Sequence, residues 1–186
     1  MRPAVVVFAV AVLAQWLLPL MGVWQHERVI REGAAVRVRC TSPDPYDPLR
    51  GRYLMVRPEE TTLPKPEGMP EWGTVPVWAT LVADADGLSR IESLSLVPAA
   101  GPSVVRLAAV VRTWDKDRDT VVVQWPIQRY YLNERLAPDA DRLVAERWRT
   151  GARPVAEFRL LDGRAVLTDV LVDGVSIRDA VRPRAP

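Results

Sequence analysis

Few residues in this chain could catalyse a reaction at neutral pH. His26 is the only histidine, and it lies just after a long apolar segment. A Ser-His-Asp triad, a Cys-His pair or a histidine-rich zinc site within the rest of the chain is therefore excluded. Lys65 and Lys116 are the only lysines, and both lie in expected loops rather than in a buried strand that would lower the pKa of the amine. We expect no catalytic residues, and a protein without enzymatic activity is favoured.

One acidic run resembles the start of a calcium-binding loop. It contains Asp115, Asp117 and Asp119. However, Thr120 stands where the loop needs a glycine for its sharp turn, and Pro126 stands where it needs a bidentate glutamate. A solvated hairpin tip explains the run better, so the sequence predicts neither a metal ion nor another cofactor here.

Four other carboxylates leave more than one interpretation open. Asp44 and Asp47 lie in a proline-rich turn, where they could cap the turn, pair with Arg50 or hold an ion. Capping is favoured, because an aspartate before a proline readily initiates a turn. Together with Glu59 and Glu60, these residues are also the candidates for a hydrolase that uses no histidine. Such an enzyme needs two carboxylates that face one another across a cleft.

A stretch of charged and aromatic residues ends one of the expected strands. It contains Arg129, Tyr130, Tyr131 and Glu134. The simpler interpretation is a cluster at a sheet edge in which Arg129 pairs with a carboxylate. The alternative is a contact face for another protein, because tyrosine and arginine are enriched among the residues that dominate binding energy.

Cys40 is the only cysteine in the chain, so no internal disulfide can form. It does not directly follow the apolar segment, as a lipid-modified cysteine would. We predict that Cys40 is a small buried hydrophobic residue rather than a reactive thiol.

The apolar segment spans residues 4–24 and is interrupted only by Gln15. At about 1.5 Å per residue it reaches about 31 Å, the thickness of the hydrocarbon core of a bilayer. Trp24 lies where an interfacial aromatic residue belongs, and Pro19 is tolerable in a membrane helix. The segment has no polar face and no small-residue cleavage site directly after it. An uncleaved membrane anchor is therefore favoured over a signal peptide or a buried core helix.

Two signals in the sequence give opposite orientations for this anchor. Arg28 and Arg31 follow the segment, whereas Arg2 and the free amine precede it, so the count of basic residues mildly favours an amino end outside the cytoplasm. We nevertheless expect the amino end inside, because a very short tail before a long domain is typical of a secretory start. This predicts a single-pass protein of the inner (cytoplasmic) membrane. Residues 1–33 form the anchor and a helical extension that ends at Gly33, and residues 34–186 form one domain outside the cytoplasm.

Composition and periodicity define this domain. The net charge of +2 and the 26% of charged residues argue against a disordered tail and against binding to nucleic acid by charge alone. Alternating apolar residues predict strands over 35–40, 53–56, 75–83, 88–97, 103–114, 120–131, 155–161, 165–172 and 175–177. Val105, Leu107, Ala109 and Val111 share one face of their strand. Residues 58–73 read as an exposed loop.

Turn and helix signals complete the fold prediction. Asp162-Gly163 and Asp173-Gly174 are strong signals for two-residue hairpins. A helix is predicted from Pro138 to Gly151, since apolar residues recur at helical spacing between them. The fold class is mainly β: an antiparallel sandwich or partly closed barrel with one covering helix, preceded by the transmembrane helix.

The run from Pro43 to Tyr53 reads PDPYDPLRGRY and resembles the hallmark of the bacterial GDYXXLXY protein family. Gly51 and Tyr53 match the hallmark. Three positions depart from it, because Arg52, Val56 and Pro58 replace its aspartate, its leucine and its final tyrosine. Any role of that aspartate therefore cannot be transferred to this chain.

Two later stretches also resemble this family. They are residues 129–134 and the closing pair of segments 163–166 and 171–174. The resemblance implies a one-pass anchor followed by a β-rich domain outside the cytoplasm. Relatives occur near polytopic membrane proteins, which suggests a membrane protein partner besides the lipid bilayer. The resemblance brings no activity and no cofactor.

These observations favour an anchored accessory or interaction module. Its candidate interaction or motif residues are Asp44, Tyr46, Asp47, Arg50, Gly51, Tyr53, Arg129, Tyr130, Tyr131 and Glu134. The alternatives are the hydrolase described above and an envelope protein that binds a small ligand or a glycan. Such a binder would use an apolar pocket lined by residues such as Trp72, Trp78 or Trp125, although core or edge packing is the simpler role of these tryptophans.

Overall fold

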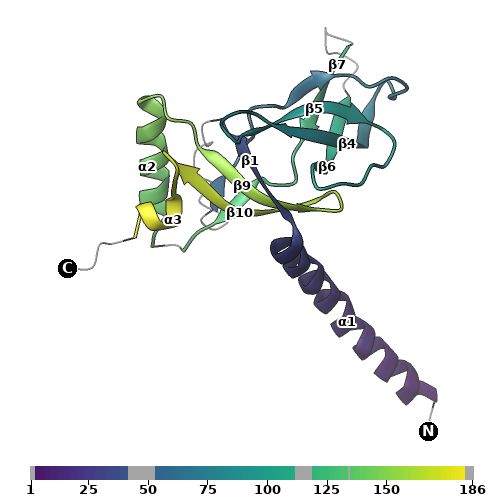
Figure 1. Ribbon diagram of the computed structural model, residues 1–186. Coiled ribbons are helices and arrows are strands. Elements are labelled where there is room, and N and C mark those ends of the chain that lie inside the picture. The colour runs from purple at the N-terminus through teal and green to yellow at the C-terminus, as the bar shows by residue number, and fades with distance from the viewer. Residues whose placement is uncertain (1–2, 42–52, 112–118, 134, 183–186) are drawn as a thin grey trace.

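A computed structural model describes residues 3–41, 53–111, 119–133 and 135–182 of the chain. In these residues a long N-terminal helix projects from a β-rich body, and two shorter helices lie at the far end of that body (Figure 1). The mainly β fold predicted from the sequence is confirmed.

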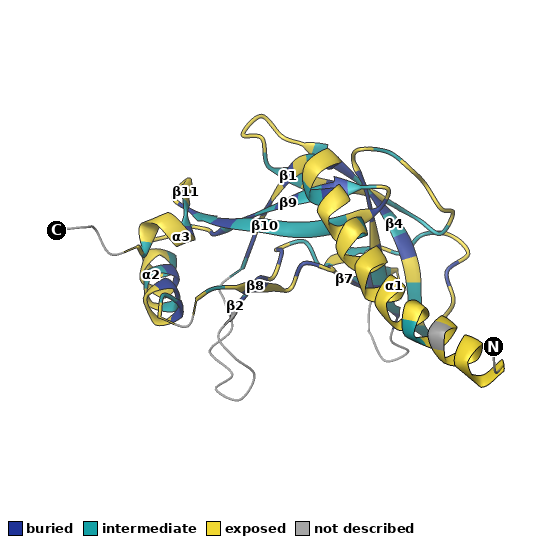
Figure 2. Cartoon of the chain, turned by 90° about the horizontal axis from the view of Figure 1, so that it is seen from below, coloured by how far each residue is buried: buried dark blue, intermediate teal, exposed yellow. Residues whose placement is uncertain are grey.

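Helix α1 (Pro3–Glu32) projects with its apolar side chains exposed (Figure 2). Its most apolar stretch has a mean hydropathy of 2.3, and none of that stretch is buried by the rest of the chain. A helix in the core of the domain is therefore ruled out. The helix is long and apolar enough to cross a membrane, as a membrane anchor or a signal sequence would.

The last two turns of α1 pack against the body. Val29 is buried there, and a guanidinium nitrogen of Arg164 donates a hydrogen bond to the side-chain oxygen of Gln25. Gly33 ends the helix, as predicted, but its φ is not positive, so no left-handed turn requires the glycine. A Cβ at this position would lie 2.4 Å from the carbonyl oxygen of Val29 and 3.0 Å from the amide nitrogen of Leu160. Close packing therefore explains the glycine.

Five strands form a nearly closed antiparallel barrel. They are β3 (Thr62–Pro64), β4 (Gly73–Ala83), β5 (Ser89–Ser95), β6 (Val104–Val111) and β7 (Thr120–Gln124), in the order β3-β7-β6-β4-β5. The predicted apolar face of β6 is confirmed, since Val105, Leu107, Ala109 and Val111 are all buried.

A second antiparallel sheet connects the barrel to α1. It consists of β1 (Ala34–Arg39), β9 (Val155–Leu161), β10 (Arg164–Val172) and β11 (Val175–Ser176), in the order β1-β9-β10-β11. Asp162 and Gly163 both have positive φ, and so do Asp173 and Gly174. Both predicted two-residue hairpin turns are thus present, with the backbone signs of type I′ turns.

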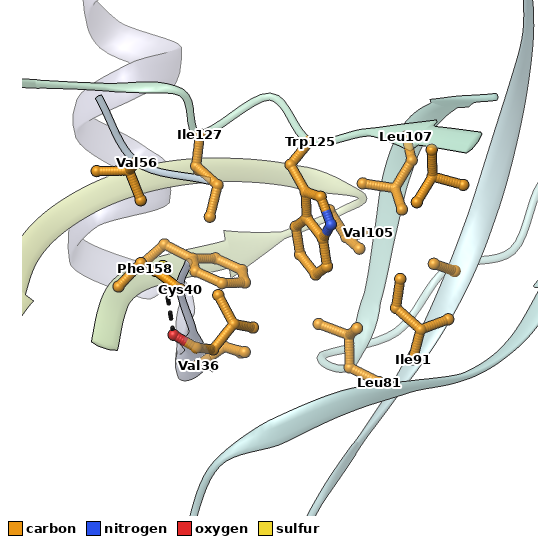
Figure 3. Close-up of a cluster of buried hydrophobic side chains, with 14 of the residues drawn as sticks. Val36, Cys40, Val56, Leu81, Ile91, Val105, Leu107, Trp125, Ile127 and Phe158 are labelled. Carbon is orange, nitrogen blue, oxygen red and sulfur yellow. Dashed lines mark hydrogen bonds between the residues drawn. The ribbon is translucent and has the colours of Figure 1, made fainter. Parts of the chain in front are cut away.

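The core lies where the barrel meets this sheet. Trp125 and Phe158 meet edge to face there, with their ring centroids 6.0 Å apart. Val36, Cys40, Leu81 and further apolar side chains from both parts surround them (Figure 3). One continuous core therefore joins the barrel and the sheet.

Two short strands and two short helices lie at the end of the body away from the barrel. Strand β2 (Tyr53–Met55) pairs with β8 (Arg129–Tyr131) as a separate ribbon. Helix α2 (Ala137–Arg149) confirms the predicted helix, and it buries Ala137, Ala140 and Val144 beside β2 and α3. Helix α3 (Ile177–Ala180) was not expected, because residues 175–177 were predicted as a strand.

Two further expectations from the sequence are wrong. The single strand predicted over 120–131 is two strands in different sheets, because Pro126 lacks the N–H that would continue the ladder from β7. The predicted loop 58–73 contains β3, which pairs with β7, and it buries Met69 in the core. Short strands at a barrel edge give too little periodicity to be recognised from sequence.

Candidate functional site

The two stretches that the sequence singled out pair with each other. In the β2–β8 ribbon, Tyr53 lies opposite Tyr131, Leu54 opposite Tyr130 and Met55 opposite Arg129. Leu54 and Tyr130 are both buried, so this pair fixes the ribbon to the core. The ribbon leaves Arg129 and Tyr131 at the surface, where 66% of Tyr131 is exposed.

Tyr130 ties the ribbon to the second sheet. Its hydroxyl donates a 2.8 Å hydrogen bond to Oδ1 of Asp169. The same oxygen accepts hydrogen bonds from the Ser176 hydroxyl, at 3.1 Å, and from the backbone N–H of Val170, at 2.8 Å. The pairing of β10 with β9 is irregular between Leu167 and Asp169, and this bulge turns the carboxylate toward Tyr130.

The electrostatics of this junction keep the phenol protonated. Burial of Tyr130 is the largest cause that raises its pKa, and the hydrogen bond to Asp169 raises it further. The guanidinium of Arg178 stacks on the ring, 4.9 Å from its centroid, and acts weakly in the opposite direction. Tyr130 is therefore a hydrogen-bond donor at neutral pH rather than a base, and it serves to hold β8 against β10.

A groove of about 580 Å³ lies beside this junction. One wall is the segment from Pro126 to Tyr131, and the other is formed by Ala165, Val166 and Leu167 of β10. Arg178 and His26 complete the lining. A second hollow of about 410 Å³ shares Pro126 and Gln128 with it and continues along β6. The exposed face on which sequence reasoning placed Arg129 and Tyr131 is thus hollowed rather than flat.

His26 places the groove next to α1. It lies two residues after Trp24, which ends the apolar segment. At about 1.5 Å per residue, this part of the groove lining is therefore within about one helical turn of the end of that segment. Sequence reasoning used the position of His26 only to exclude histidine-dependent catalysis in the rest of the chain, and it did not connect this residue with residues 129–131.

Several candidate residues lie outside the described residues. They are Asp44, Tyr46, Asp47, Arg50, Gly51 and Glu134, together with Asp115, Lys116 and Asp117 of the acidic tip. The backbone of Tyr53 belongs to β2. Asp169 and Arg178 were missed, although one signal was available: Thr168-Asp169 interrupts an otherwise apolar strand.

Glu59 and Glu60 both line a smaller pocket of about 150 Å³ between β1 and the barrel. The Glu60 carboxylate accepts a hydrogen bond from the backbone N–H of Ile91. Glu59 lies 3.8 Å from the guanidinium of Arg153. Each carboxylate thus has a partner within the chain. The pocket is well below the roughly 300–1,000 Å³ that is typical of small-molecule sites.

The three tryptophans considered for a ligand pocket lie in different surroundings. Trp125 is in the core, and its ring N–H donates a 2.9 Å hydrogen bond to the carbonyl oxygen of Glu60. Trp72 is 75% exposed. Trp78 is partly buried, with the guanidinium of Arg106 at 5.8 Å from its ring centroid. Of the three, only Trp125 borders the cavities described above, and it lines two of them.

The buried position predicted for Cys40 is confirmed. It is 2% exposed, and its sulfur contacts the carbonyl oxygen of Val38 at 3.7 Å. Burial raises the pKa of its thiol from 9.0 to about 12. The thiolate, which is the reactive form, is therefore strongly disfavoured in the folded protein.

Comparison with known proteins agrees with the resemblance seen in the sequence. The family model described as GDYXXLXY protein matches residues 15–170. The chain belongs to the GDYXXLXY family. The match extends from the apolar helix to β10, so it includes both walls of the groove and Asp169, whereas Ser176 and Arg178 lie beyond it. No curated protein and no solved structure matches the chain.

Proposed function

We propose that this GDYXXLXY protein is a single-pass anchored interaction module of the bacterial inner membrane. Helix α1 holds the β-rich domain outside the cytoplasm, at the membrane surface. The groove beside Tyr130 contacts a membrane protein partner. The observation that carries the proposal is the position of this groove, which is lined by His26, two residues after the end of the apolar segment.

The attachment of α1 to the domain supports this proposal. Val29 is buried against the body, and Arg159 donates a 3.3 Å hydrogen bond to the carbonyl oxygen of Gly33. These contacts begin within two helical turns of Trp24, so a membrane that holds the apolar segment also holds the domain in a fixed orientation. A partner embedded in the same membrane would meet the same face of the domain every time.

The chemistry of the groove lining also supports a binding role. The exposed side chains of Arg129 and Tyr131 from β8 line the groove together with the partly buried Leu167. Such mixtures of aromatic, basic and apolar groups are typical of the residues that dominate protein interfaces.

Site-specific photocrosslinking in native membranes tests the proposal. A benzophenone amino acid replaces Tyr131 at the groove, and in a matched control it replaces Asp86, an exposed turn residue away from the groove lining. We expect the groove position to give an adduct that mass spectrometry identifies as a membrane protein, and the control position to lack that adduct. Adducts with lipid alone, or the same adduct from both positions, would contradict the proposal.

A further inference from the structure

Strand β10 has an unpaired edge that faces the groove. On one side β10 pairs with β9 from Arg164 to Leu171, with a bulge between Leu167 and Asp169. On the other side β11 covers only Leu171 and Val172. Within the described part of the chain, no strand pairs with Ala165, Val166 or Leu167 on that side, and all three residues line the groove.

The hairpin turn determines which backbone groups point into the groove. Asp162 and Gly163 form a two-residue turn, so the flanking pair Leu161 and Arg164 exchange hydrogen bonds with each other. Pairs alternate along an antiparallel ladder. The next pair, Leu160 with Ala165, therefore directs its N–H and C=O groups outward, and so does the pair of Phe158 with Leu167. Ala165 and Leu167 offer two donors and two acceptors at this edge.

Both ends of this edge are fixed. At one end the backbone N–H of Arg106 in β6 donates a 2.9 Å hydrogen bond to the carbonyl oxygen of Gly163. At the other end Asp169 is tied to Tyr130 across the groove. The open stretch is therefore held in extended form between two anchoring contacts, and binding costs little ordering of the protein.

The open stretch itself carries none of the residues that usually protect an exposed strand, although the bulge after Leu167 limits it to three residues. Lysine, proline or an inward-pointing charge usually prevents an edge strand from pairing with another chain. Ala165, Val166 and Leu167 provide none of these.

The groove lining indicates which types of side chain a bound segment would carry. Val166 and Leu167, which are only partly buried, offer apolar contacts, whereas Arg129 and Arg178 place two guanidinium groups at the groove. The carboxylate of Asp169 already accepts three hydrogen bonds within the chain. An extended segment that alternates apolar with acidic side chains would complement this lining, since neighbouring side chains of a strand point to opposite faces.

We propose that the partner binds by strand addition: an extended acidic-apolar segment, next to a transmembrane span of the partner, pairs with β10 along Ala165–Leu167. This inference rests on the proposed function and specifies how the partner binds. The segment enters from the side of His26, which lies two residues after the apolar segment.

Hydrogen exchange of single backbone amides gives the first test. The full-length protein is compared in nanodiscs cut directly from its native membrane and in nanodiscs of lipids extracted from that membrane. We expect the amides of Ala165 and Leu167 to exchange at least about tenfold more slowly in the native nanodiscs, while residues 92–95 of the barrel strand β5 exchange equally in both. Fast exchange in both preparations would overturn the inference. Slow exchange in both would also overturn it, because lipid would then cover the edge.

A matched pair of substitutions gives the second test. Ala165→Pro removes the outward N–H, whereas Ala165→Ser keeps it with a similar side-chain volume. Loss of one backbone hydrogen bond to the partner should lower the yield of the Tyr131 adduct by about five- to tenfold for the proline variant only. Equal melting temperatures of the two variants would establish that the proline variant is folded. The exchange measurement uses the chain without any substitution, so it tests the inference even if the proline variant does not fold.

The two proposals fail in different ways. If Tyr131 still gives a membrane protein adduct while Ala165→Pro and Ala165→Ser have the same yield, the interaction module stands and strand addition is wrong. If the benzophenone amino acid at position 131 gives no protein adduct in the chain that keeps Ala165, the proposed function itself is wrong.

Discussion

At the scale of single residues, Cys40 links burial to the dependence of stability on pH. The folded-state pKa of its thiol is about 12, compared with an ordinary value of 9.0. Burial therefore favours the neutral thiol, and this contribution to stability is fully present below about pH 9. This contribution is lost as the pH rises from 9.0 toward 12, because the thiol then ionises in the unfolded chain while it is still protonated in the folded protein.

We expect the free energy of unfolding of the full-length protein in detergent micelles to fall between pH 8.5 and 10 by more than it does in the Cys40→Ala variant. Urea unfolding of both proteins at several pH values measures the difference. The titration of lysines and arginines is common to both proteins and cancels. Tyr130, whose pKa is also raised, adds to the loss only above its ordinary value of 10.0. The same slope in both proteins would mean that the thiol is not buried.

At the scale of secondary-structure elements, the junction between α1 and β9 depends on the absence of a side chain. A Cβ at Gly33 would meet the backbone of Val29 at 2.4 Å and that of Leu160 at 3.0 Å. Backbone atoms cannot rotate away as side chains do. We expect Gly33→Ala to destabilise the protein by about 1–3 kcal/mol, the usual cost of overpacking.

Thermal unfolding in detergent micelles measures this effect. Gly22→Ala is the matched control, because nothing lies within 4 Å of a Cβ at that position of the same helix. A melting temperature that drops equally in both variants, or in neither, would show that α1 is not docked through Gly33.

At the scale of the whole molecule, the apolar helix α1 is long enough to cross a membrane, as an anchor or a signal sequence would, and the proposed location of the domain can be tested directly. Full-length protein should remain in the membrane fraction after alkaline carbonate extraction and should keep its amino-terminal residues in intact mass analysis. A phosphatase that folds only outside the cytoplasm, fused to the C-terminus, should be active. A variant without residues 4–24 should lose both membrane retention and this activity. If a reporter that works only in the cytoplasm is active at the C-terminus, the orientation is opposite to the proposed one. If the mature chain lacks its amino-terminal residues, the apolar segment is a cleaved signal peptide and not an anchor.

Much of the fold could be predicted because its patterns are local. The alternation in β6 and the Asp-Gly turns of β9–β10 and β10–β11 each depend on a few neighbouring residues, and the structure confirms them. The split of residues 120–131 into β7 and β8 was missed, although Pro126 was visible in the sequence. Whether a proline only bends a strand or ends its pairing depends on the neighbouring strands, and these come from distant parts of the chain.

The candidate site was predicted only in part for the same reason. Arg129, Tyr130 and Tyr131 were singled out by residue type, but their partner β2 lies more than seventy residues earlier in the chain. The role of Asp169 follows from a bulge in β10, and His26 reaches the groove only because α1 packs on the β9–β10 hairpin. No short sequence window contains these contacts.

The sequence by itself therefore determined the apolar helix, the mainly β class and the family, since hydropathy, alternation and motif spacing are properties of consecutive residues. Only the tertiary structure decided that Tyr130 is a buried connector, that Tyr131 borders a groove and that, among the described residues, no strand pairs with the edge of β10 along this groove. The physical reason is that burial and strand pairing depend on contacts between distant segments, and these contacts exist only once the chain has folded.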